Sequence, residues 1–299
     1  MMGPPPQTAV PMLRPPSVEV PSLERSWLFA RLAVPAGGCP DAGVASLVGT
    51  VLAELVATAR RADPEAQWFY DRVDSLTGPR LSLGFHAVPP ALDAVRQRLR
   101  AYDPQVAFAA DPYAVRDAAR GGPLASAASD LALALLGGDA PWLAGAELAL
   151  AVTHLRHLCG LMPAADRLAF LFLHWQDRSR RLTGAQRREL AAQADTGAEK
   201  IVLAAGDLPL TDAVASAWRR YLDRVADVID RDHEAPSPPR GFLLAHHAQL
   251  THERWGIGPN VDSLAALALR LSMVRDQPAV PTPSPPAPRR PQPHAPARA

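Results

Sequence analysis

The sequence predicts an α+β protein in which a small antiparallel sheet with packed helices is followed by a mostly helical bundle. Two patterns support this fold class. Short apolar and aromatic segments bounded by turn residues occur before residue 110, whereas from residue 124 onward apolar side chains recur at helical spacing. Hydrophobic residues make up 48% of the 299 residues, which is enough to build a packed core.

Three strands are expected in the first part of the chain. Residues 26–34 are rich in apolar and aromatic side chains and end at Pro35, and residues 67–73 and 80–88 form a pair joined by the turn-forming sequence DSLTGP. Side chains along 80–88 alternate between two faces. One face carries Leu81, Leu83 and Phe85, and the other carries Arg80, Ser82, Gly84 and His86.

Helices are predicted where apolar residues repeat every three or four positions. Residues 44–61 show this repeat and end with arginines, and a second helix is expected at 90–100. The segment YDPQVAFA (102–109) is a candidate for a further strand. The later helices are predicted at residues 124–136, 141–160, 164–181, 184–205, 211–232, 240–255 and 261–274.

The composition divides the chain into one domain and two tails. Of the 32 prolines, seven lie in residues 1–21 and nine in residues 277–299. These ends are poor in large apolar residues, so residues 1–22 and 275–299 are expected to be disordered. Residues 23–274 are expected to form a single domain, with the sheet part at about 23–112 and the helical part at about 113–274.

Charge and cysteine usage exclude several classes of partner. The chain has 31 Lys and Arg against 30 Asp and Glu, with no basic stripe, so a nucleic-acid partner is not expected. The apolar stretch 131–161 is interrupted by GGDAP and carries charged residues and histidines, so no membrane span is expected. Only Cys39 and Cys159 are present and the N-terminus lacks a signal-peptide pattern, which indicates a cytoplasmic protein.

The segment HHAQLTHERWGI (246–257) is the densest polar cluster in the chain. On a helix over 240–255, His246, Gln249 and Glu253 share one face, whereas His247 and His252 are expected on other faces. Because the histidines do not converge, no metal site is predicted. Two interpretations of the shared face remain open, namely a substrate-contacting surface and a polar helix with satisfied hydrogen bonds.

Three other histidines lie in otherwise apolar helices. His154, His157 and His174 are expected to be buried, hydrogen-bonded core residues rather than bases. The chain has no phosphate-binding loop, no dinucleotide fingerprint and no serine-hydrolase motif, so no cofactor is predicted.

The order of several short motifs resembles the thiopeptide-type bacteriocin biosynthesis family. This family has the fold of the C-terminal, glutamate-eliminating domain of lantibiotic dehydratases. The motifs that carry the resemblance are Trp27-Leu28, WFYDRV (68–73), RLSLGFH (80–86), YDPQ (102–105), ASDLALALL (128–136) and HHAQLTHERWGI.

Four departures from the eliminating members separate this sequence from them. Where those relatives resemble one another in carrying two strand arginines, this chain has Ser82 and Gly84. Gln249 occupies the position of a helix histidine, and Gln105 that of a glutamate. A departing glutamate carboxylate needs a cationic or donor clamp, which serine, glycine and glutamine do not supply. The chain is therefore most similar to the stand-alone pyridine synthases of thiopeptide biosynthesis.

The resemblance implies a cofactor-independent enzyme that joins two dehydroalanines in a formal aza-[4+2] cycloaddition, with loss of water and of the leader peptide. The implied partner is a ribosomally made precursor peptide with its leader, and the dehydratase subunits are further candidates. A glutamate-eliminating lyase and a non-catalytic leader-binding scaffold are the alternatives. The expected catalytic residues are Tyr70, Ser82, His246 and Gln249, and the expected substrate-binding residues are Arg72, Arg80, His86, Glu253 and Arg254.

Two of these residues, Arg72 and His86, also have a purely structural interpretation. Arg72 pairs equally well with a nearby carboxylate, and His86 is also suited to a structural hydrogen bond at a strand end. Gly84, which has no side chain, is expected to leave room for a bulky peptide over the sheet.

Overall fold

The computed structural model describes residues 24–34, 40–75, 78–109, 112–137, 145–208, 210–231 and 240–276. Within these ranges the protein is α+β, as predicted. The chain divides into two compact units, residues 1–129 and 130–299, and the boundary falls inside helix α4 (Pro112–Leu136). The expected tails lie outside the described residues, apart from Arg275 and Asp276 at the end of the last helix.

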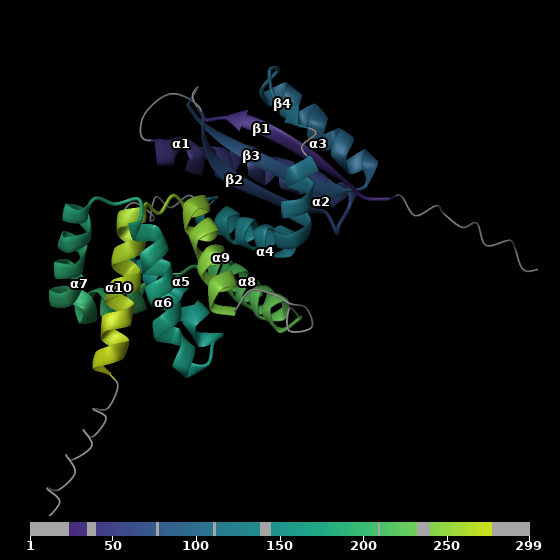
Figure 1. Ribbon diagram of the computed structural model, residues 1–299. Helices are drawn as coiled ribbons and strands as arrows, with labels where there is room; N and C mark the ends of the chain where they lie inside the picture. Colours follow the sequence, from purple (N-terminus) through teal and green to yellow (C-terminus); the bar gives the residue numbers. More distant parts are fainter. Residues whose placement is uncertain are drawn as a thin grey trace, which may run out of the picture. The chain divides into compact units, whose positions relative to one another are not determined.

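The first unit is built on a four-stranded sheet (Figure 1). Its strands are β1 (Ser26–Ala33), β2 (Gln67–Ser75), β3 (Gly78–Ala87) and β4 (Ala107–Ala109). They lie in the order β2-β3-β1-β4, and every neighbouring pair is antiparallel. With helices between β1 and β2 and between β3 and β4, this is a ferredoxin-like arrangement. The predicted strands are therefore confirmed, and the fourth is the short segment within YDPQVAFA.

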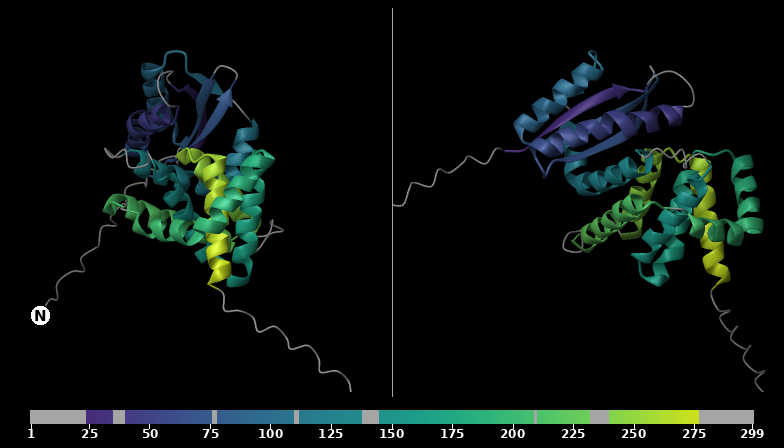
Figure 2. Two further views of the ribbon diagram at one scale, coloured as in Figure 1. Left: turned by 90° about the vertical axis from the view of Figure 1, so that its left-hand side faces the viewer. Right: turned by 180° about the vertical axis from the view of Figure 1, so that it is seen from behind.

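Helices cover one face of this sheet (Figure 2). Residues 40–62 form α1 (Pro40–Leu47), a π-helical stretch (Val48–Leu52) and α2 (Ala53–Ala62), and α3 (Pro89–Tyr102) packs against α2. Residues 43–62 are long and apolar enough to cross a membrane by length and composition. However, most of the large apolar side chains of this stretch are buried in the core of the unit, which is typical of a core helix. These buried side chains are Val44, Leu47, Val48, Leu52, Leu55 and Val56.

The strand register assigns each side chain to one of two faces. Trp68 and Tyr70 lie opposite Phe85 and Leu83, and all four are buried. Ser82 belongs to the other face, together with the strand residues directly opposite it. Those residues are Arg31 on β1 and Asp71 on β2.

Gly84 does not leave open space over the sheet, which corrects the sequence-based expectation. It pairs with Phe69 across the strands, and a Cβ on Gly84 would lie 2.5 Å from Cε1 of the Phe69 ring. The ring therefore occupies the volume that the missing side chain vacates, a known way to stabilise a glycine in a sheet. Phe69 also packs edge-on against Trp27 and Phe29.

The outer edge of β2 is capped by serines of α4. The backbone N–H of Trp68 donates to Oγ of Ser126 at 3.4 Å, and that of Tyr70 donates to Oγ of Ser129 at 3.2 Å. An edge strand otherwise presents unpaired N–H groups, which favour aggregation. The serines, three residues apart on one helix face, satisfy two of these groups.

The second unit is entirely helical within the described residues (Figure 1). Beyond the end of α4, α10 packs against α5, α6 and α7, and α6 also packs against α9. α6 to α10 lie within two residues of their predicted ranges, whereas α5 begins at Glu147 rather than at residue 141 and α4 begins at Pro112 rather than at residue 124. The helices are α5 (Glu147–Gly160), α6 (Ala164–Ser179), α7 (Gly184–Ala204), α8 (Asp212–Arg231), α9 (Arg240–Trp255) and α10 (Pro259–Arg275).

The sequence WGIGP sets the connection between α9 and α10. Gly256 has φ of 82°, a conformation that favours glycine. Its N–H donates to the Glu253 carbonyl at 3.2 Å, and the N–H of Ile257 donates to the His252 carbonyl at 2.9 Å. This is a Schellman motif, after which Pro259 starts α10. The tight connection brings Asp262, in the first turn of α10, close to His252.

Candidate functional site

A chain of buried hydrogen bonds crosses the interior of the helical unit. Nε2 of His247 lies 2.9 Å from the Tyr221 hydroxyl, and that hydroxyl lies 2.7 Å from Nε2 of His154. Nδ1 of His154 lies 2.8 Å from Nε2 of His252, whose Nδ1 lies 2.8 Å from Oδ1 of Asp262. All five side chains are buried. They come from α5, α8, α9 and α10, so the chain connects four helices.

The carboxylate at one end fixes the direction of every bond in this chain. Ionised Asp262 only accepts, so Nδ1–H of His252 donates to it and Nε2 of a neutral His252 ring accepts from Nδ1–H of His154. By the same logic, the Tyr221 hydroxyl donates to Nε2 of His154 and accepts from Nε2–H of His247. A single set of tautomers therefore satisfies all four contacts.

Burial keeps the rings of this chain neutral. It lowers the pKa of His154 well below its usual value, an effect to which neighbouring His252 also contributes. It lowers the pKa of His247 to about 3. It also lowers the pKa of His252, although Asp262 opposes that shift. Burial raises the pKa of the Tyr221 hydroxyl, so the phenol stays protonated.

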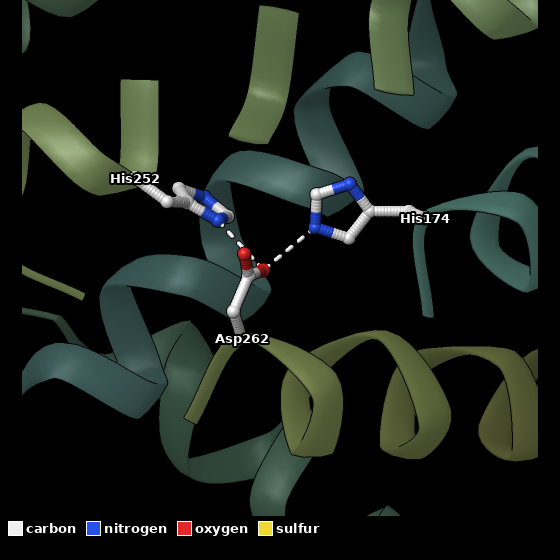
Figure 3. Close-up of side chains that lie close together, drawn as sticks. All are labelled: His174, His252 and Asp262. Carbon is white, nitrogen blue, oxygen red and sulfur yellow. Dashed lines mark hydrogen bonds and ion pairs between the residues drawn. The ribbon is translucent and has the colours of Figure 1, made fainter. Parts of the chain in front are cut away.

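Three basic side chains, His174, Arg178 and His252, meet at Asp262. Oδ1 accepts from His252 and, at 2.6 Å, from Nε2 of His174 (Figure 3). Nε of Arg178 lies 2.6 Å from Oδ2, an ion pair whose angle falls outside hydrogen-bond geometry. Burial alone would raise the pKa of Asp262, but His174 and His252 hold it well below the usual range. The carboxylate is therefore ionised, with Oδ1 hydrogen-bonded to two histidines and Oδ2 in an ion pair with Arg178.

His174, His252 and Asp262 also have the chemistry of metal ligands. One ligand atom of each lies within 4.8 Å of the others (Figure 3). The separations of 2.6 and 2.8 Å are those of hydrogen bonds, and a metal would have to replace the two bridging protons. The Arg178 guanidinium beside Oδ2 would also repel a divalent cation. The geometry thus favours a hydrogen-bonded cluster over a metal centre.

His247 and His252 lie about 140° apart on a helix of 3.6 residues per turn, so they occupy different faces of α9 as expected. Both are nevertheless buried, and hydrogen bonds join them through Tyr221 and His154.

The remaining histidine predictions have mixed outcomes. His154 and His174 are buried and hydrogen-bonded, as predicted. His157 is exposed instead, and its Nδ1 accepts from Nε1 of Trp218 at 3.1 Å.

The outward face of α9 carries His246, Gln249 and Glu253. His246 is exposed and the other two are half-buried. Oε1 of Glu253 accepts from Nε2 of Gln249 at 3.3 Å and from Nη1 of Arg178 at 2.7 Å. Arg254, also expected to contact substrate, is buried instead. The polar stripe predicted for this helix is therefore present, and Arg254, which was predicted separately, does not belong to it.

The predicted residues of the sheet unit fall on two different faces. Tyr70 and Arg72 lie on the face of Leu81 and Leu83, and the Tyr70 side chain is 0% exposed. Partly exposed on the other face are Arg80, Ser82 and His86. The structure therefore groups these three and separates them from Tyr70 and Arg72.

His86 stacks on Trp27, with ring centroids 4.8 Å apart. Burial, with a further contribution from the charge of Arg25, lowers the pKa of His86. Its ring is thus held by packing against β1, whereas the structural alternative for this residue was a hydrogen bond at the strand end.

Sequence reasoning missed the residues that support the polar positions. Arg31 stands directly opposite Ser82, and Arg178 binds both Glu253 and Asp262. A signal for Arg31 was present, since it is the only charged residue in 26–34. Arg178 and Asp262 gave no such signal, because their pairing depends on tertiary packing.

Comparisons with solved structures show a shared architecture. TsrL superimposes with a TM-score of 0.53 and 15% identity over 85% of this chain and 96% of its own. The pyridine synthase TbtD from thiomuracin biosynthesis superimposes with a TM-score of 0.53 and 17% identity, over 84% of this chain and 98% of TbtD. This chain has their fold. No family model and no curated protein matches the sequence at a significant level.

A third structure matches over only part of its length. The tRNA-dependent lantibiotic dehydratase MibB from Microbispora sp. 107891 gives a TM-score of 0.52 and 19% identity. The match covers 83% of this chain but only 28% of MibB. The fold suggested by the sequence motifs is therefore confirmed, and at these identities the likeness concerns the fold alone.

Proposed function

We propose that this chain forms the central pyridine of a thiopeptide. Two dehydroalanines of a modified precursor peptide join with an intervening backbone amide in a formal aza-[4+2] cycloaddition. Loss of water and of the leader peptide as a carboxamide then gives the aromatic ring. The observation that carries the proposal is the fold match to TbtD, a pyridine synthase, over 98% of that protein's length. MibB, by contrast, is matched over 28% of its length.

The polar side chains suit the proton transfers of this reaction. The amide shifts to its iminol form before the ring closes, so a proton leaves nitrogen and one is gained by oxygen. A serine hydroxyl or a glutamine amide can donate and accept at once without carrying charge. We assign Ser82 and Gln249 to this role, and His246 to substrate contact. The steps need no electron carrier, so the reaction is proposed to be cofactor-independent.

We assign Tyr70, Arg72 and Arg254 no direct part in the reaction. Tyr70 is fully buried and Arg254 is buried, whereas a residue that contacts a peptide substrate must be reachable. Arg72 shares the face of Tyr70. Arg80 and His86 remain proposed substrate-binding residues, whereas Glu253 is assigned to holding Gln249. The proposed partner is a ribosomally made precursor with its leader, together with dehydratase subunits, in the cytoplasm.

One observation favours elimination of glutamate as a second candidate function. Arg31 lies opposite Ser82, and Arg80 lies on the same sheet face. Guanidinium groups bind carboxylates well, so these two could hold a departing glutamate even without arginines at 82 and 84.

The test is mass spectrometry after incubation of the protein with two synthetic precursors. One carries two dehydroalanines, a thiazole and the leader, and the other carries a glutamylated serine. The proposal expects a macrocycle and free leader carboxamide from the first and no change in the second. Glutamate released from the second supports elimination, and two unchanged peptides contradict both enzymatic functions. R98M, a change at a surface arginine paired with Glu54, serves as the control variant.

A further inference from the structure

The amide of Gln249 can adopt only one orientation towards Glu253. Nε2 of Gln249 lies 3.3 Å from Oε1 of Glu253, and that carboxylate is paired with Arg178. An ionised carboxylate has no proton to donate, so the amide must turn its NH₂ towards Glu253. Its carbonyl oxygen, across the amide carbon from Nε2, remains the group that can accept a hydrogen bond from another molecule.

A buried arginine, Arg178, holds the carboxylate of Glu253 in place. Oε1 accepts from Nη1 of Arg178 at 2.7 Å, and the Arg178 side chain is 1% exposed. Arg181 reaches the same oxygen at 3.3 Å, but its side chain is 62% exposed. An exposed pair of this kind contributes little, whereas a short charge-assisted bond from a buried guanidinium fixes the carboxylate. Arg178 is therefore the dominant anchor.

Arg178 also contacts a second carboxylate, that of Asp262, through its Nε. Its Nε lies 2.6 Å from Oδ2 of Asp262, the carboxylate that also accepts from His174 and His252. One planar guanidinium thus bridges a fully buried acid on α10 and a half-buried acid on α9. The rigid buried cluster ends, through Arg178 and Glu253, at the amide of Gln249.

We propose that Arg178 is a positioning residue which, through Glu253, fixes Gln249 so that its amide oxygen faces the substrate as a hydrogen-bond acceptor. The role of this acceptor in pyridine formation rests on the proposed function. The orientation of the amide does not, because it follows from the contacts alone. Arg178 acts through other side chains and does not itself touch the substrate in this scheme.

The orientation is tested by NMR of the full chain, through the Gln249 side-chain amide signals that disappear in Q249A. Loss of the acceptor in E253A should accelerate exchange of these protons with solvent by about tenfold, the scale of one charge-assisted hydrogen bond. R178K should do so partially, since lysine cannot bridge both acids as a fork. R180M, which alters a neighbouring exposed arginine paired with Asp177, should leave the signals unchanged. Unchanged exchange in E253A overturns the proposal.

Kinetics test the link to catalysis. E253A should lower kcat by about tenfold and change KM by less than about threefold, because an orienting contact acts mainly in the transition state. E253A combined with Q249A should be no slower than Q249A alone, since both remove the same interaction. Additive losses overturn the positioning role. If the unaltered protein forms no pyridine, the proposed function fails, and the exchange data still decide the orientation. E253A changes a half-buried side chain, so the test stands even where R178K does not fold.

Discussion

The phenol oxygen of Tyr221 and Nε2 of His154 lie 2.7 Å apart in the interior of the helical unit. This contact joins α8 to α5, and the same oxygen accepts from His247 on α9. It is the central bond of a chain in which every donor has a partner. Buried networks of this kind contribute to stability only when they are complete, because each unsatisfied member loses its hydration without replacement.

Removal of this one oxygen should therefore destabilise the protein. Y221F leaves Nε2 of His154 and Nε2–H of His247 without partners, and each buried unsatisfied group costs about 1–3 kcal/mol. Denaturant unfolding should show a loss of about 2–4 kcal/mol in the free energy of unfolding. Y102F, which changes an exposed tyrosine, is the matched control and should be neutral. Equal stability of the two variants would show that the network is not closed.

Acid should destabilise the protein well above the range in which carboxylates titrate. Burial lowers the pKa of His154, His247 and His252 in the folded state, whereas in the unfolded chain they titrate near 6.5. The unfolded state therefore binds more protons as the pH falls. Stability is fully present above about pH 6.5 and decreases below it, for His247 down to about pH 3.

The slope of the free energy of unfolding against pH shows which residues cause this loss of stability. Between about pH 6.5 and pH 3, buried His247 contributes about 1.4 kcal/mol per pH unit. Asp262 cannot account for a loss between pH 6.5 and 5, because its stabilising effect decreases only as the pH approaches the ordinary carboxyl pKa of 3.8 and falls towards the lowered folded-state pKa. Urea unfolding at several pH values should show a shallower slope in H247Q than in the unaltered protein. Identical slopes would contradict a neutral, buried His247.

Metal ions should not stabilise this protein. The cluster of His174, His252 and Asp262 is closed by hydrogen bonds and by Arg178, so zinc has no unprotonated ligand set to enter. A site filled at 100 times its Kd would add about 2.7 kcal/mol. Thermal unfolding with zinc, and separately with a chelator, should give the same Tm as without either. A rise in Tm with zinc that is absent in D262N would reverse this conclusion.

Local sequence patterns were sufficient to predict most of the architecture. Alternation marked β3, and periodic apolar residues with terminal Gly and Pro marked α9 and α10, because these signals depend on neighbours in the chain. The outward positions of His246 and Gln249 follow from the same periodicity.

Residues whose role depends on tertiary contacts were not predictable. Asp262 looks like an ordinary helix N-terminal acid, and only packing brings His174, 88 positions away in the chain, to its side. Likewise, alternation alone does not tell which face of β2 joins which face of β3. The register answers that question and separates Tyr70 from Ser82.

Gly84 shows how a missing side chain can be misread and leads to a further prediction. G84A would place a Cβ 2.5 Å from Cε1 and 2.7 Å from Cζ of Phe69, so the ring or the strand must move. Overpacking of this kind costs about 1–3 kcal/mol. G160A is the control, since a Cβ there meets nothing within 4 Å. Denaturant unfolding should separate the two variants, and an unaffected G84A would mean that Phe69 is free to move aside.

Ser82 and Arg31, paired across β1 and β3, allow the two candidate reactions to be separated on one sheet face. If Ser82 assists proton transfer in cyclisation, S82A should lower the rate of macrocycle formation by about tenfold or more, within the usual range for acid–base groups. R31M should then have a small effect, because no carboxylate has to be held. If the reaction is elimination, the order reverses, since R31M removes a cation that stabilises the departing glutamate. Product formation by both variants, measured with each synthetic precursor beside R98M, gives opposite rankings for the two reactions. Equal, unaltered rates for S82A and R31M would exclude this face from either chemistry.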